Sequence, residues 1–120
     1  MANPVRGEVE FTAGDKTWTL RYTANSLCEL EDHMGKTTTE IISVMQGDPG
    51  VKAVRSVFWA GLIDRHPDMD VRQAGEIMTD AGGITRAIEL IGDAFSRAFP
   101  ASEEGARPQR GARAGNGRKS

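Results

Sequence analysis

The stretch Thr23-Ala-Asn-Ser-Leu-Cys-Glu-Leu-Glu-Asp-His-Met-Gly35 decides the fold, because it forms a complete short helix where the sequence pattern changes. The Thr23 hydroxyl can accept hydrogen bonds from the first helical turn, and Gly35 can take the left-handed conformation that ends a helix. Leu27, Leu30 and Met34 recur on one helical face. The residues before this stretch alternate as strands do, and those after it follow the helical period. We expect a hairpin and several helices to pack around it.

Two alternating runs predict an antiparallel hairpin before Thr23, with a turn at Ala13–Lys16. A two-stranded hairpin is marginal alone in water, so its apolar face should lie on the helices. Its outer edge stays unpaired unless another element covers it, so this edge is a candidate docking site for another chain. The apolar face consists of Val5, Val9, Phe11, Trp18, Leu20 and Tyr22.

Four further helices are predicted after Gly35. Thr37 and Glu40 form a capping box before the apolar residues Ile41, Ile42, Val44 and Met45. A central helix runs from Val51 to the His66-Pro67 stop, since a residue before proline is pushed out of helical geometry. Its buried stripe should contain Val54, Val57, Phe58, Gly61 and Leu62.

Asp70 should cap the next helix, which Gly82-Gly83 ends. The last helix is predicted from about Ile84 to Phe99, with an inner stripe of Ile84, Ala87, Ile88, Ile91, Ala94, Phe95 and Ala98. The predicted fold is therefore α+β, an N-terminal β-hairpin packed on a small bundle of about five helices.

Composition divides the chain near Pro100. The 120 residues are 38% hydrophobic with a net charge of −2; residues 1–99 hold ten Lys/Arg against fifteen Asp/Glu, and residues 100–120 hold five against two. The single cysteine excludes an internal disulfide, and there is no signal segment or apolar run of membrane length. These features favour a cytoplasmic protein without a membrane partner.

After Pro100 the residues are mostly Gly, Ala, Arg and Pro with no apolar period. Such a segment cannot offset the entropy of ordering, so we predict a domain over residues 1–100 and a disordered tail over 101–120. Without aromatic side chains to stack on bases, the tail would bind nucleic acid weakly and with strong salt dependence. A solubilising or partner-capturing role is favoured. The basic tail residues are Arg107, Arg110, Arg113, Arg118 and Lys119.

A metal site is the most tempting chemistry, because Asp64, His66, Asp68 and Asp70 alternate in a predicted turn. A calcium loop starting at Asp64 would need glycine at its sixth place and glutamate at its twelfth, where this chain has methionine and glycine. Asp70 is better explained as a helix cap and the others as solvated turn acids. A metal-dependent enzyme is therefore the least favoured interpretation.

No other residue pattern indicates catalysis. Cys28 has no basic neighbour in sequence, so we expect a buried small apolar residue. His33 near a helix end favours a surface role. Glu29, Glu31 and Asp32 occupy nearby positions that point in different directions, which predicts a solvated face. Phosphate loops, nucleophile elbows and dinucleotide motifs are absent, so we predict no catalytic residue, metal or cofactor.

Short blocks spread over roughly residues 1–100 carry a resemblance to a known family. The blocks are the hairpin Glu8–Thr23, Asn25–Glu31, Phe58–Leu62, His66-Pro67 and Ile91–Phe95. In this order they resemble a family of small phage and gene-transfer-agent tail proteins. Members of that family look like tail assembly chaperones of long-tailed phages, and the label tail tube protein is also used for them.

The resemblance implies two alternative functions. The first is a non-enzymatic assembly chaperone that binds the tape-measure protein, the tail tube protein or both before they polymerise, in the cytoplasm of the bacterial host. The second is a structural tail (tube) subunit that stays with the particle. A tube subunit normally closes rings through sheets, and one hairpin supplies little sheet.

A chaperone needs an exposed surface that binds reversibly, and the chain offers a hairpin edge and the outer part of the central helix. Either surface could also join copies of the protein into a homo-oligomer. The residues expected to bind a partner are Trp18, Leu20, Tyr22, Trp59, Leu62 and Ile63.

Overall fold

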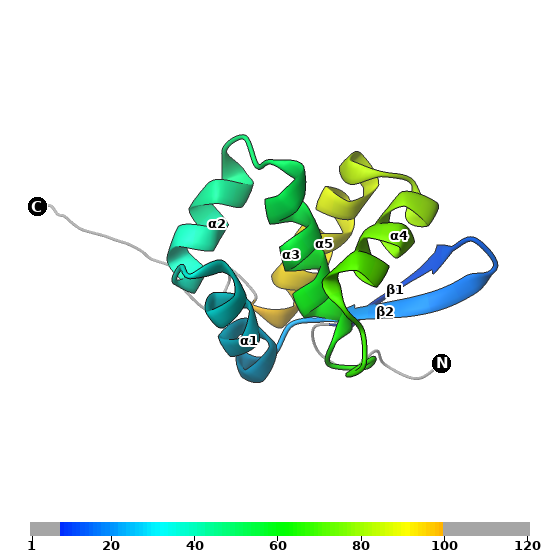
Figure 1. Cartoon of the computed structure of the whole chain (residues 1–120), viewed down its shortest axis with the longest axis horizontal. Coiled ribbons are helices and arrows are strands. Elements are labelled where there is room, and N and C mark those ends of the chain that lie inside the picture. Colours follow the sequence, from blue (N-terminus) through cyan, green and yellow to red (C-terminus); the bar gives the residue numbers. More distant parts are fainter. Residues whose placement is uncertain (1–7, 100–120) are drawn as a thin grey trace, which may run out of the picture.

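The computed structural model describes residues 8–99, and Figure 1 shows them as one hairpin beside a group of helices. The predicted α+β class, with an N-terminal hairpin and five helices, is confirmed. Val5 and the expected tail over residues 101–120 lie outside the described residues. The elements are β1 (Glu8–Ala13), β2 (Lys16–Arg21), α1 (Ala24–Met34), α2 (Thr38–Gln46), α3 (Val51–Leu62), α4 (Val71–Ala81) and α5 (Ile84–Ala98).

Helix α1 begins and ends where its sequence predicts. The Thr23 hydroxyl accepts a hydrogen bond from the Ser26 N–H at 3.1 Å, and the Ser26 hydroxyl accepts one from the Thr23 N–H at 2.7 Å. Gly35 takes the left-handed conformation with φ 68°. Thr37 and Asp70 cap α2 and α4 through their side chains in the same way, so the caps read from the sequence are confirmed.

Helix α3 is the centre of the fold, where it packs against the four other helices and β2 (Figure 1). Phe58 is fully buried, and its ring centroid lies 5.5 Å from that of Phe11 on β1. The helix ends at Leu62, four residues before His66, and the His66 N–H closes a further turn onto the Leu62 carbonyl at 2.8 Å. The predicted central helix is confirmed, although it ends earlier than expected.

A close approach between β2 and α3 depends on Gly61. A Cβ atom added to Gly61 would lie 2.7 Å from Leu20 Cδ2 and 2.8 Å from Tyr22 Cζ. The Tyr22 hydroxyl donates a 2.7 Å hydrogen bond to the Val57 carbonyl on the same helix. The absence of a side chain at residue 61 therefore lets the hairpin lie directly on the central helix.

The hairpin covers the helices with one face and leaves the other face polar. Its register pairs Val9 with Leu20 and Phe11 with Trp18 across a two-residue turn. On the inner face Val9, Phe11 and Leu20 are buried, whereas Glu10 on the outer face is exposed. Helices α3, α4 and α5 contact the hairpin. No helix within residues 8–99 is both long and apolar enough to cross a membrane.

Two burial predictions on the helices are wrong. Cys28 is exposed, because it lies about 160° around α1 from the buried Leu30. On α5, Leu90 is buried while Ile84 and Ile88 are 38% and 36% exposed. The hairpin, α3 and α4 cover only one side of α5. This buried side includes Leu90 and excludes Ile84 and Ile88, so it is rotated around the helix axis relative to the predicted stripe.

Candidate partner-binding surfaces

The hairpin edges present backbone groups that the ladder does not use. Pairs in an antiparallel ladder alternate between hydrogen-bonded and non-hydrogen-bonded, and the Ala13–Lys16 pair that closes the two-residue turn is hydrogen-bonded. The N–H and C=O groups of Thr17, Thr19 and Arg21 on β2 therefore point away from β1. Within residues 8–99 no third strand pairs with either edge. The predicted open edge is thus present in the described fold.

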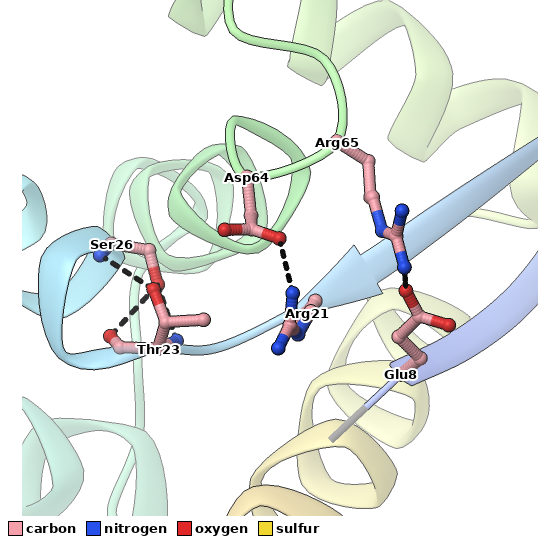
Figure 2. A network of polar contacts seen from close by, with 6 residues as sticks. All are labelled: Glu8, Arg21, Thr23, Ser26, Asp64 and Arg65. Atoms are coloured by element: carbon pink, nitrogen blue, oxygen red, sulfur yellow. Dashed lines mark hydrogen bonds and ion pairs between the residues drawn. The ribbon is translucent and has the colours of Figure 1, made fainter. Parts of the chain in front are cut away.

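Ion pairs hold the base of the hairpin to the turn after α3 (Figure 2). Arg21 Nη1 lies 3.1 Å from Asp64 Oδ2, and Arg65 pairs with Glu8 at the start of β1. These side chains are partly exposed, so each pair contributes at most about 1 kcal/mol. Their effect is to orient the turn, and Asp64 is a pairing partner of Arg21 rather than the solvated acid expected from the sequence.

Trp18 lies at the junction between the hairpin and this turn. Its ring stands edge-on to His66, with centroids 4.9 Å apart, and the His66 Nε2 atom is buried without a hydrogen-bond partner among the described residues. Burial lowers the pKa of His66, and the positive charge of Arg65 lowers it further. The neutral imidazole therefore packs under Trp18 at neutral pH.

A shallow pocket of about 380 Å³ lies beside the outer part of α3. Trp59, Ile63 and Asp64 contribute to its lining, together with residues from the start of α1. The Trp59 indole N–H donates to the Met69 carbonyl at 3.0 Å, and the His33 ring lies 5.1 Å from the indole. Trp59 and Ile63 are half-buried, so part of each side chain is available on the surface.

The six residues expected to bind a partner differ in how far they are exposed. Leu20, Tyr22 and Leu62 have exposures of 0%, 3% and 0%, so the chain's own elements enclose them. Strand alternation and helical period place Leu20 and Leu62 on the inward faces of β2 and α3, and Tyr22 follows directly after β2 on the same side as Leu20. Only Trp18, Trp59 and Ile63 remain partly exposed. The basic tail residues Arg107, Arg110, Arg113, Arg118 and Lys119 lie outside the described residues.

A larger apolar groove, which sequence reasoning missed, lies between α2 and α5. This α2–α5 groove has a volume of about 670 Å³, and none of its twelve lining residues is charged. It contains the three large apolar side chains Ile42, Ile88 and Phe99, which are 37%, 36% and 45% exposed. The signal in the sequence is an apolar arc on α5 that is wider than the arc its own partners cover.

Two of the acidic residues that suggested chemistry, Asp70 and Glu31, have structural roles. Asp70 accepts from the Gln73 N–H at 2.7 Å as the cap of α4. Glu31 Oε2 accepts from both the N–H and the hydroxyl of Thr38 at 2.7 Å, a contact that the sequence pattern did not indicate. These two bonds, the hydroxyl one first, lower the pKa of Glu31. Among residues 8–99, no three His, Cys, Asp or Glu side chains converge as a metal site requires.

Comparison with known proteins gives one match. The sequence model of the family described as "Phage tail tube protein, GTA-gp10" matches residues 6–100, which is most of the chain. No curated protein and no solved structure matches this chain.

Proposed function

We propose that this chain, which belongs to the phage tail tube protein family GTA-gp10, is a non-enzymatic tail assembly chaperone. Membership of a tail family implies interaction with other tail proteins. In the proposed role the protein binds the tape-measure protein, the tail tube protein or both in the bacterial host cytoplasm, and releases them as the tail polymerises.

The observation that carries this proposal is the balance between sheet and helix. Subunits that close into a tube normally do so through sheets, and residues 8–99 supply a single two-stranded hairpin beside five helices. The same residues leave a strand edge, a half-buried Trp59 and an uncharged groove open on the surface. Such surfaces suit reversible binding of apolar client segments.

A structural tail subunit is the second candidate, because the name of the family refers to the tail tube. In that role the same edge and groove would join neighbouring subunits permanently. The two functions differ in where the protein is found after assembly, since a chaperone leaves the particle and a subunit remains in it.

Co-expression with the tape-measure protein of the same gene cluster tests the chaperone role. The parent chain should increase the soluble yield of the tape-measure protein. Thr19→Pro removes an outward-facing N–H, which an edge strand tolerates, and should lower that yield while circular dichroism shows a folded domain. The matched control Thr19→Val keeps the N–H and should behave as the parent.

Truncation after Pro100 tests whether the client binds to the strand edge or to the basic tail. We expect the truncated chain to keep the client soluble. A loss of soluble client on truncation, with Thr19→Pro behaving as the parent, would instead assign client binding to residues Arg107–Lys119.

A further inference from the structure

The α2–α5 groove is apolar over a length that the chain's own packing does not require. Ile88, Phe95 and Phe99 recur along one side of α5 from its middle to its end, beside the arc that the hairpin, α3 and α4 bury. Ile42 faces them from α2. Helices α2 and α5 hardly touch each other, so the space between them is open.

We infer that the α2–α5 groove binds one amphipathic helix of another protein. This inference rests on the proposed function only in taking a separate protein as the partner. Helix α2 is nine residues long, and α5 lines the groove from Ile88 to its end, which gives walls of about 13 and 16 Å. Walls of this length accommodate about two to three turns of a helix with apolar anchors at i, i+3, i+4 and i+7.

The walls of the groove favour a helix over a strand as the occupant. Both walls are helices, whose backbone groups are already hydrogen-bonded along their own axes. A strand placed between them would leave its N–H and C=O groups facing apolar side chains such as Ile42 and Ile88, at a cost in free energy for each unpaired group. A helix satisfies its own backbone and presents only side chains.

The chain's own terminal segments do not supply such an occupant. Residues 100–120 follow directly from Phe99 at the end of the groove, but apart from prolines they contain no apolar side chain larger than alanine. Residues 1–7 contain only Met1 and Val5 as large apolar residues besides a proline. Neither segment has the repeated apolar positions that the groove would bury.

A second copy of the chain also fits poorly, because the exposed apolar area is small. Only three large apolar side chains of the groove are exposed, and each of them, Ile42, Ile88 and Phe99, is less than half exposed. A stable dimer buries about 800 Å² on each partner.

The absence of charged residues in the groove lining further predicts that binding of the partner helix is insensitive to salt.

The test uses a fluorescein-labelled synthetic 15-residue peptide with leucine at i, i+3, i+4, i+7 and i+11 and Lys or Glu elsewhere. A second peptide has the same composition with the leucine period scrambled. Binding to the full chain is measured by fluorescence anisotropy at low and high salt. We compare the parent with the groove variants Ile42→Glu and Ile88→Glu and with Val51→Glu, which alters an apolar residue that is 55% exposed outside the groove.

The inference predicts saturable binding of the periodic peptide at both salt concentrations, at least tenfold tighter than that of the scrambled peptide. Each groove variant should weaken binding at least tenfold, and Val51→Glu should leave it within twofold of the parent. Equal binding of both peptides, equal loss with Val51→Glu, or no saturation up to about 1 mM would overturn the inference.

Two further outcomes would also overturn it. Sedimentation of the parent as a dimer that Ile88→Glu converts to a monomer would show that the groove joins copies of the chain. A tenfold gain in peptide affinity on truncation after Pro100 would show that the chain's own C-terminal residues occupy the groove. The peptide assay contains neither the tape-measure protein nor the tube protein, so its failure leaves the result of the chaperone assay unaffected.

Discussion

Replacement of Gly61 by alanine should destabilise the fold, although alanine favours a helix. The new Cβ atom would lie 2.7 Å from Leu20 Cδ2 and 2.9 Å from the Tyr22 hydroxyl oxygen, and both side chains are enclosed. Overpacking of this kind costs about 1–3 kcal/mol, and a weakened hydrogen bond from Tyr22 to Val57 adds about 1 kcal/mol. The helix propensity of alanine returns about 1 kcal/mol. We expect a net loss of about 2 kcal/mol.

For a domain of 60–100 residues, a loss of this size lowers Tm by roughly 10 °C. Calorimetry or thermal circular dichroism measures the change. The matched control is Gly92→Ala on α5, where no atom lies within 4 Å of the added Cβ and the position is exposed. There the helix propensity acts alone, so Tm should rise by a few degrees. An equal rise with Gly61→Ala would refute the close approach of β2 to α3.

Four further predictions concern local elements of the fold. Thr23→Ala removes the cap of α1 and should cost about 1 kcal/mol in urea unfolding; an unchanged midpoint would contradict the observed cap. Phe58→Ala should cost about 3–5 kcal/mol and Ile91→Ala about 2–5, and a parent-like midpoint for either would place that residue outside the core. Folding lowers the pKa of His66 from its ordinary value of 6.5, so below about pH 6.5 the unfolded chain binds more protons than the folded one and Tm should fall as the pH drops. The fall should be smaller in His66→Asn, and an equal dependence of Tm on pH in both proteins would show that His66 is not its cause. Truncation after Pro100 should leave Tm nearly unchanged, and a drop of many degrees would show that residues 101–120 pack on the domain.

Local signals in the sequence were sufficient to predict the elements and their order. The hydroxyls of Thr23 and Thr37 and the carboxylate of Asp70 act within a few residues of the helix starts they cap, so no tertiary information is needed to locate those starts. Gly35 and Gly82 likewise end helices through their own backbone conformations. Alternation alone located both strands of the hairpin.

The details that could not be predicted depend on how the elements are arranged in space. Leu90 is buried and Ile88 is exposed because the neighbouring elements cover one side of α5. The helical period alone does not specify which side they cover. The burial of Cys28 was inferred from its neighbour in sequence, although adjacent residues on a helix lie 100° apart. The bonds from Thr38 to Glu31 also cross between two helices.

The candidate site was only partly predictable for the same reason. The open strand edge follows from the number of strands, and it was expected. To predict the α2–α5 groove, one must know that α2 and α5 stand apart, which the sequence does not show. Three of the six expected contact residues are buried in the core: Leu20, Tyr22 and Leu62.

The copy number of this protein in purified particles tests the chaperone role most directly. Quantitative mass spectrometry of particles and of the lysate of producing cells compares this chain with the tail tube subunit. The chaperone account predicts that the protein is present in the lysate and absent from particles, or far below the tube subunit in amount. Stoichiometric recovery with purified tails would contradict it and establish a structural subunit.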